Sequence, residues 1–312
     1  MFPLTNRVIL KLAEAVAWTR PLEFFPGWRF GIEEKPEPKG KLKFRLAIWD
    51  YCNRRQLQKS IIMNWHHGTR VNVYLGNDLS RCLFVAGCID PNEFAFLDGV
   101  MDPGMIFVDV GANEGLYSVF AAKRAETVLA IEPSRREFER LRANLELNNL
   151  TNVRARKLAL SNQNGEAVLH ISGYEHEGQN TFGEFPYFGV ELSYKETVPL
   201  KRLDDLLEDE RLKKVDIIKL DIEGAEFLAL DGSSNTLRTS RPLLLLELFD
   251  GALRRQGSSS AEVIRLLKSF DYEIYVFDQD SGRPVKSERY SEVSENIVAA
   301  PRERRWRGLN DN

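Results

Sequence analysis

The chain has 312 residues, of which 43% are hydrophobic and 29% charged, and 43 Lys and Arg against 46 Asp and Glu give a formal net charge of −3. This composition excludes collagen-like, disulfide-scaffold and disordered proteins, and the length predicts one large domain with an appendage or two unequal domains. The near-neutral charge argues against a nucleic-acid partner, because binding to phosphates along a duplex requires a strongly basic face.

The three cysteines, Cys52, Cys82 and Cys88, are odd in number and lack CxxC spacing. This pattern indicates reduced thiols rather than a disulfide framework or a zinc site, and it predicts a cytoplasmic protein. The apolar stretch from Val8 to Trp18 is interrupted by two charged residues and is too short to span a membrane. We therefore expect neither a signal peptide nor a transmembrane segment, but a short amphipathic helix packed on the body.

Residues 1–88 form a predicted N-terminal extension, helical or mixed, that could contact substrate or another subunit. It holds four of the five tryptophans: Trp18, Trp28, Trp49 and Trp65. Packing against a neighbouring surface explains them better than a ligand platform does. The charged, proline-rich stretch from Glu33 to Lys43 is typical of an exposed connector. The main domain is predicted to span residues 89–300, and residues 301–312 to form a solvated basic tail.

Strands and helices are predicted to alternate from Met105 onward. An apolar run to Val110 precedes a helical pattern to Arg124, and a second run at 128–131 precedes a helix at 134–148. Further strands are expected at 153–160, 167–171, 215–220, 243–248 and 272–277. Such alternation predicts an α/β fold with a doubly wound, mostly parallel Rossmann-like sheet and helices on both faces. A ligand then binds at the carboxyl ends of the strands.

Two features at the first two strand ends together predict a nucleoside-containing cofactor. The first strand ends in Asp109, whose carboxylate is expected to face the ligand. In the loop that follows, Gly111 and Gly115 permit a tight turn and a close approach of ligand to backbone. Glu132 ends the second strand, where it can accept hydrogen bonds from ribose hydroxyls. The loop lacks the third glycine of a dinucleotide motif, and Asp109 and Glu114 would repel a pyrophosphate. The pattern therefore favours the cationic cofactor S-adenosylmethionine.

Charged side chains also gather where the predicted strand at 215–220 ends. Strand alternation places Lys219, Asp221 and Glu223 on one side if the strand continues that far. Crowded charges shift one another's pKa, which is how a catalytic base is tuned. Asp221 or Glu223 is the first candidate for a base, and His176, in a polar loop, is the second. In the structural alternative, Lys219 merely neutralises Asp221, and Glu226 complements the dipole of the next helix.

The segments VDVGANEG, AIEPSRREFERLRANLELNN, ALSNQNGEA and VDIIKLDIEGAEFLALDG, in this order, resemble the FkbM family of S-adenosylmethionine-dependent methyltransferases. The resemblance runs from about residue 90 to about residue 277. It implies a class I methyltransferase fold and a site whose cofactor-binding residues are Glu93, Asp109, Gly111, Asn113, Gly115, Glu132, Ala159, Leu160 and Asp221. Within that set the 109–115 loop admits the methionine portion, Glu132 holds the ribose, Ala159 and Leu160 lie beside the adenine, and Glu93 closes over the cofactor.

The resemblance implies an O-methyltransferase acting on a hydroxyl of a glycan or polyketide-like natural product. Two alternatives stay open at this point: an NAD-dependent oxidoreductase on the same kind of sheet, and a non-catalytic nucleoside-binding module. Asp221, Glu247 and Asp250 end adjacent strands and carry the oxygen ligands that Mg²⁺ prefers. Acids at strand ends are common, so no metal site is predicted.

Overall fold

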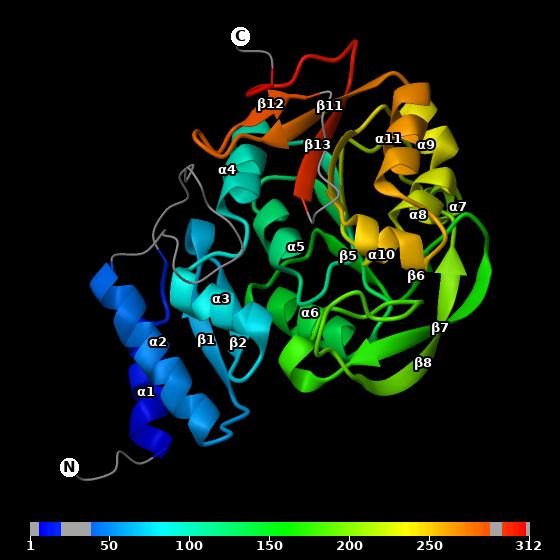
Figure 1. Ribbon diagram of the computed structural model, residues 1–312. Coiled ribbons are helices and arrows are strands. Elements are labelled where there is room, and N and C mark those ends of the chain that lie inside the picture. Colours follow the sequence, from blue (N-terminus) through cyan, green and yellow to red (C-terminus); the bar gives the residue numbers. More distant parts are fainter. Residues whose placement is uncertain (1–5, 20–38, 288–294, 310–312) are drawn as a thin grey trace.

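An eight-stranded sheet forms the centre of the molecule (Figure 1). The computed structural model describes residues 6–19, 39–287 and 295–309. Across the sheet the order is β12 (Pro284–Lys286), β11 (Tyr272–Phe277), β13 (Glu295–Pro301), β10 (Leu243–Leu248), β9 (Ile217–Leu220), β3 (Ile106–Val110), β4 (Thr127–Ile131) and β5 (Val153–Arg156). Strands β10, β9, β3, β4 and β5 run parallel, whereas β13 is antiparallel to both of its neighbours. The predicted mostly parallel sheet is confirmed.

Helices cover both faces of this sheet, because its inner strands are apolar on both sides. Phe107 and Ile217 belong to one buried cluster, and the next residues along each strand, Val108 and Ile218, belong to another. The first cluster includes residues of α4 (Pro91–Val100), α5 (Leu116–Ala121) and α6 (Arg135–Leu147). The second includes residues of α7 (Leu203–Asp209), α8 (Glu226–Asp231), α9 (Ser234–Thr239), α10 (Asp250–Arg255) and α11 (Ser260–Ser269). The fold is therefore doubly wound, as predicted.

The N-terminal extension is mixed and packs onto the first of these clusters. It consists of α1 (Asn6–Val16), α2 (Lys39–Arg54), a hairpin of β1 (Ser60–Asn64) and β2 (Arg70–Tyr74), a short 3₁₀ turn (His66–Gly68) and α3 (Asp78–Ala86). Trp65 is buried, with its ring 5.2 Å from that of Phe94 in α4 and 6.4 Å from that of Phe120 in α5. The hydrophobic core is thus continuous from this extension to the sheet. No helix among the described residues is long and apolar enough to cross a membrane.

The extension contains the expected amphipathic helix, but its second helix begins within the expected connector. The short amphipathic helix is confirmed as α1, which buries Ile9 and Ala13. Trp49 is buried, as packing predicts, but Trp18 is 48% exposed, and Trp28 lies outside the described residues. The expected connector is wrong at its end, because residues 39–43 already belong to α2. All three cysteines are buried and unpaired.

A second, three-stranded sheet lies beside the main one and consists of β6 (Ala159–Leu160), β8 (Leu192–Lys201) and β7 (Gly165–Ser172). The single strand predicted at 153–160 is therefore wrong, since β5 and β6 belong to different sheets. The chain changes direction where Arg156 is held by Glu210 and Lys157 by Glu196, with Nζ to Oε1 at 2.5 Å. The two ion pairs direct the consecutive side chains of Arg156 and Lys157 to different elements, because Glu210 follows α7 and Glu196 belongs to β8.

The C-terminal region packs partly against the body. Strand β13, which the sequence did not predict, lies between β10 and β11. Trp306 is buried, Arg304 pairs with Asp216 at 3.4 Å, and Arg307 pairs with Asp102. Arg302, Arg305 and Arg307 are exposed. The predicted solvated basic tail therefore agrees with these three arginines, but not with Trp306 and Arg304, which pack against the body.

Candidate active site

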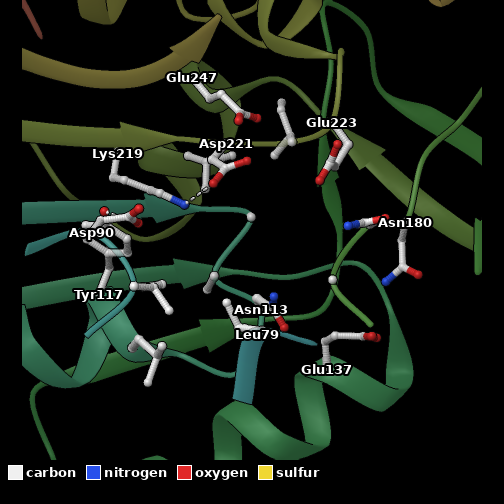
Figure 2. Close-up of a pocket in the computed structure, with 18 of the residues that line it drawn as sticks. Leu79, Asp90, Asn113, Tyr117, Glu137, Asn180, Lys219, Asp221, Glu223 and Glu247 are labelled. Carbon is white, nitrogen blue, oxygen red and sulfur yellow. Dashed lines mark hydrogen bonds and ion pairs between the residues drawn. The ribbon is translucent and has the colours of Figure 1, made fainter. Parts of the chain in front are cut away.

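A cavity of about 1130 Å³ opens at the carboxyl ends of the parallel strands. Residues at the ends of β3, β4, β9 and β10 form its floor, and α3, the 177–182 loop and β6 contribute to its walls (Figure 2). The position matches the expectation for a doubly wound sheet, in which strand ends and the loops after them create the ligand site.

The loop after β3 is shaped by two glycines with different tasks. Gly111 lines the cavity at φ +77°, and a Cβ there would lie 1.9 Å from the Asp221 carbonyl oxygen. Gly115, at φ +82°, is not among the lining residues, and a Cβ there would instead lie 2.4 Å from Cδ1 of Leu141 in α6. The second glycine therefore serves helix packing, whereas the first brings the loop backbone against the next strand end.

Asp109 lies beneath this loop and does not line the cavity. It is fully buried, and its Oδ2 accepts a hydrogen bond from the Ser118 hydroxyl at 2.6 Å. Burial raises the pKa of Asp109, against the effect of the nearby Lys219 ammonium. The expectation that this carboxylate faces a ligand is wrong, but a role in organising the loop agrees with its position. The charge of Glu114 is also compensated, because its Oε1 pairs with Arg140 at 2.9 Å.

Glu132 joins the loop to the end of β4. Its Oε2 accepts the Asn113 N–H at 2.9 Å and its Oε1 accepts the Ser134 N–H at 3.0 Å. The side chain is only 5% exposed, and burial, followed by the charge of Glu137, raises the pKa of Glu132 to about 8. Asn113 lines the cavity with a buried Oδ1 that has no hydrogen-bond donor among the described residues. A polar ligand with hydroxyl groups would complete the bonding of both side chains.

Apolar side chains surround the cavity at one end and buried acids at the other. Ala159 and Leu160 of β6 line it as buried residues. At the opposite end, Asp90 accepts a hydrogen bond from the Tyr117 hydroxyl at 2.9 Å, and Glu93 accepts one from Asn296 at 3.1 Å. Burial raises the pKa of Asp90 to about 6 and that of Glu93 to about 8.

The cluster at the end of β9 is only partly as predicted. The strand ends at Leu220, so alternation does not continue to Glu223, which has a left-handed backbone with φ +53°. Lys219 Nζ contacts Asp221 Oδ2 at 3.1 Å and lies 4.8 Å from the centre of the Tyr117 ring. Burial lowers the pKa of Lys219, but the charges of Asp221 and Asp109 outweigh it and raise the pKa. Lys219 is therefore a charged lysine committed to Asp221.

Glu223 differs from Asp221 in its surroundings. Its carboxylate extends into the cavity (Figure 2), and its Oε2 is buried without a hydrogen-bond donor among the described residues. Burial, then the charges of Glu247 and Asp221, raise the pKa of Glu223 well above its ordinary range. Glu226 holds the backbone of this turn by accepting the N–H groups of Ile222 at 3.0 Å and Gly224 at 3.2 Å.

The family model described as the methyltransferase FkbM domain matches residues 109–274. The chain belongs to the FkbM methyltransferase family. It is 27% identical over 166 residues to Methyltransferase 1 of Beauveria bassiana (strain ARSEF 2860), covering 48% of this chain and 64% of that protein. It is also 27% identical over 183 residues to the 2-O-methyltransferase NoeI of Sinorhizobium fredii, covering 54% and 73% respectively.

A solved structure of methyltransferase FkbM from Methylobacillus flagellatus KT is also similar, with a TM-score of 0.40 and 14% identity, covering 71% of this chain and 53% of that one. The matched part of the chain spans less than two thirds of the length of Methyltransferase 1. The main sheet is mostly parallel and doubly wound, as predicted, and among its described strands β12 and β13 run opposite to the others. Family membership favours methyl transfer over the oxidoreductase alternative.

Two residues weighed for catalysis or metal binding do not line the cavity. The Nδ1 of His176 lies 2.8 Å from Asp78 Oδ2. Asp250 accepts the Ser260 N–H at 2.9 Å and pairs with Arg254. Among the described residues, no group of three or more His, Cys, Asp or Glu side chains is arranged to hold a metal ion.

Tyr117, Tyr187 and Arg81 are among the lining residues that the sequence analysis missed. Tyr117 contacts both Asp90 and Lys219, and Tyr187 interacts with Glu223. Arg81 lies on α3, in the N-terminal extension. Tyr117 falls in the first turn of the helix after the glycine loop, and this position is a signal that could have identified it. No local pattern marks Tyr187 or Arg81, since both reach the cavity through tertiary packing.

Proposed function

We propose that the chain is an S-adenosylmethionine-dependent methyltransferase that methylates a hydroxyl group of a glycan or polyketide-like natural product. The observation that carries the proposal is the junction of Glu132 and the Gly111–Asn113 turn on one cavity wall. A carboxylate at the tip of β4, fixed by two backbone N–H groups, can accept hydrogen bonds from both ribose hydroxyls. The unpartnered Asn113 Oδ1 beside it supplies a further acceptor.

The remaining walls fit the other parts of this cofactor. Ala159 and Leu160 provide apolar surface for a purine. Gly111 lines the cavity and has no side chain, so a ligand there meets backbone. Asp90 and Glu93, at the far end, provide carboxylates for an ammonium group. When bound, S-adenosylmethionine supplies an activated methyl group on a sulfonium, so positioning of the acceptor hydroxyl accounts for much of the rate.

We assign the general base to Glu223. A base must reach the acceptor hydroxyl, and the buried Oε2 of Glu223 extends into the cavity without a competing donor among the described residues. The raised pKa of Glu223 makes its carboxylate a stronger base once it is deprotonated. Asp221 is less suited, because Lys219 holds its Oδ2 at 3.1 Å. In this assignment Asp221 and Lys219 fix the turn that presents Glu223.

The acceptor is assigned to the hydroxyl-rich class for two reasons. Gln179 and Asn180 line the cavity beside Glu223 and offer amide donors and acceptors to hydroxyl groups. The relative NoeI is named as a 2-O-methyltransferase, which supports transfer to oxygen. Tyr187, stacked on Phe249 with ring centres 5.2 Å apart, adds a flat surface on the same side.

Isothermal titration with S-adenosylhomocysteine tests the cofactor assignment, with NAD as the control ligand. We expect saturable binding of the first compound and none of the second, and absence of S-adenosylhomocysteine binding at millimolar concentration would overturn the proposal. Methyl transfer is then measured with methyl-tritiated S-adenosylmethionine and a panel of saccharide and polyketide acceptors. Glu223→Gln should lower turnover about 10²- to 10⁴-fold at unchanged cofactor affinity. Glu184→Gln, at an exposed position outside the cavity, is the matched control.

A further inference from the structure

Helix α3 brings part of the N-terminal extension onto the proposed cofactor cavity, although it lies outside residues 109–274. Asn77 caps the helix, its Oδ1 accepting the Ser80 N–H at 2.9 Å, and Gly87 ends it with φ +89°. Both helix ends are therefore defined, and Leu79 and Arg81 are held against the cavity. Leu79 of this helix and Asn113 of the glycine loop both line the cavity (Figure 2).

The cavity wall has an excess of acids. Twelve of its lining residues are Asp or Glu, and only Lys219 and Arg81 are basic. Lys219 is committed to Asp221 and to the face of Tyr117. Arg81, by contrast, makes no side-chain hydrogen bond, ion pair or ring contact with any residue that the structure describes. A half-buried guanidinium with five donors beside so many acids, yet paired with none of them, is available to a ligand.

The position of Arg81 relates it to one end of the proposed ligand. Glu132 and Ala159 mark the ribose and adenine end, on the β4 side of the cavity. Arg81 lies on α3, and Asp90, which lines the cavity as well, follows shortly after the end of this helix at Ala86. The amino-acid end of the cofactor carries an ammonium and a carboxylate. The acids of this wall suit the ammonium, but the carboxylate needs a cation.

We propose that Arg81 binds the α-carboxylate of the methionine portion of S-adenosylmethionine. A guanidinium presents parallel N–H donors that match the two oxygens of a carboxylate. The N-terminal extension then supplies one of the groups that recognise the cofactor and completes a site that the family domain alone leaves without a free cation among its described lining residues. This inference rests on the proposed function.

A matched pair of ligands and a matched pair of variants test it by titration calorimetry. Decarboxylated S-adenosylmethionine retains the adenosine, the sulfonium and the ammonium but lacks the carboxylate. We expect the wild-type chain to prefer S-adenosylmethionine over this analogue by about 10- to 100-fold, the usual range for a charge-assisted hydrogen-bonded contact. Arg81→Gln should abolish the preference, and Arg81→Lys should restore part of it. Arg54→Gln removes the same charge from an exposed position outside the cavity and should leave the preference unchanged.

Melting temperatures of the variants separate a folding defect from a binding defect. Arg81 has no side-chain partner among the described residues, so we expect Arg81→Gln to melt near the wild-type temperature. If Arg81→Gln does not fold, the ligand preference is measured on Arg81→Lys instead. A variant at position 81 that retains the full wild-type preference, or a wild-type chain without any preference, would overturn the inference while leaving the proposed function intact. Failure of the wild-type chain to bind either compound would overturn the proposed function, and the inference with it.

Discussion

Replacement of Gly111 by alanine tests whether the turn after β3 is built around the absence of a side chain. The new Cβ would lie 1.9 Å from the Asp221 carbonyl oxygen and 2.9 Å from Cγ2 of Ile222. The first of these is backbone and cannot rotate away. The φ of +77° adds strain of about 1–2 kcal/mol for a residue with a Cβ, and overpacking adds about 1–3 kcal/mol. We expect Gly111→Ala to lower the free energy of unfolding by about 2–5 kcal/mol.

Gly104→Ala is the matched control, because Gly104 also has a positive φ, +89°, but nothing lies within 4 Å of the Cβ position. It should lose only the strain contribution of about 1–2 kcal/mol. Urea denaturation monitored by circular dichroism gives both values by linear extrapolation. Because the clash displaces the Asp221 backbone, Gly111→Ala should also weaken S-adenosylhomocysteine binding, whereas Gly104→Ala should not. Equal losses of stability in the two variants would refute the close-approach argument.

Three further predictions concern charged groups. Glu132→Gln should weaken S-adenosylhomocysteine binding about 10- to 100-fold in calorimetry, since the ribose hydroxyls lose a charged acceptor; an unchanged Kd would contradict the ribose role. Because the pKa of Glu223 is raised and a base acts deprotonated, turnover should increase with pH above the ordinary glutamate range of about 4.3. A rate already constant from about pH 5 upward would rule Glu223 out as that base. Arg140→Met leaves the carboxylates of Glu114 and Glu177, both 1% exposed, without their shared cation and should cost about 3–5 kcal/mol in urea denaturation. Arg142→Met, which breaks an exposed pair, should cost about 0.5 kcal/mol or less, and similar losses for the two arginine variants would argue against the buried network.

Local patterns were sufficient for the centre of the fold. The apolar run before Gly111 and the helical spacing after Ser134 correspond to β3 and α6 within a few residues. Glu132 was identified because its place at a strand tip follows from counting along two adjacent elements. Both kinds of feature depend on contacts between near neighbours in the chain, which periodicity records directly.

Other elements could not be predicted, because their stability comes from distant partners. β8 has mostly exposed side chains, and it forms a strand because it pairs with β7 in an antiparallel register. β13 follows a long polar stretch and completes the sheet between β10 and β11. Trp306 and Arg304 pack against the body through distant partners, although the charges around them looked like a solvated tail.

The same division applies to the candidate site. The sequence by itself determined the glycine turn, the ribose-binding candidate and the acids that follow β9, since each adjoins a strand end that apolar periodicity locates. Only the tertiary structure decided that Asp109 lies beneath the loop, that His176 pairs with Asp78 and does not itself line the cavity, and that Glu223 extends into it. It also decided that Arg81 faces the same cavity from the N-terminal extension. The physical reason is that strand position follows from local apolar patterning, whereas the partner of each charge depends on which distant elements pack together.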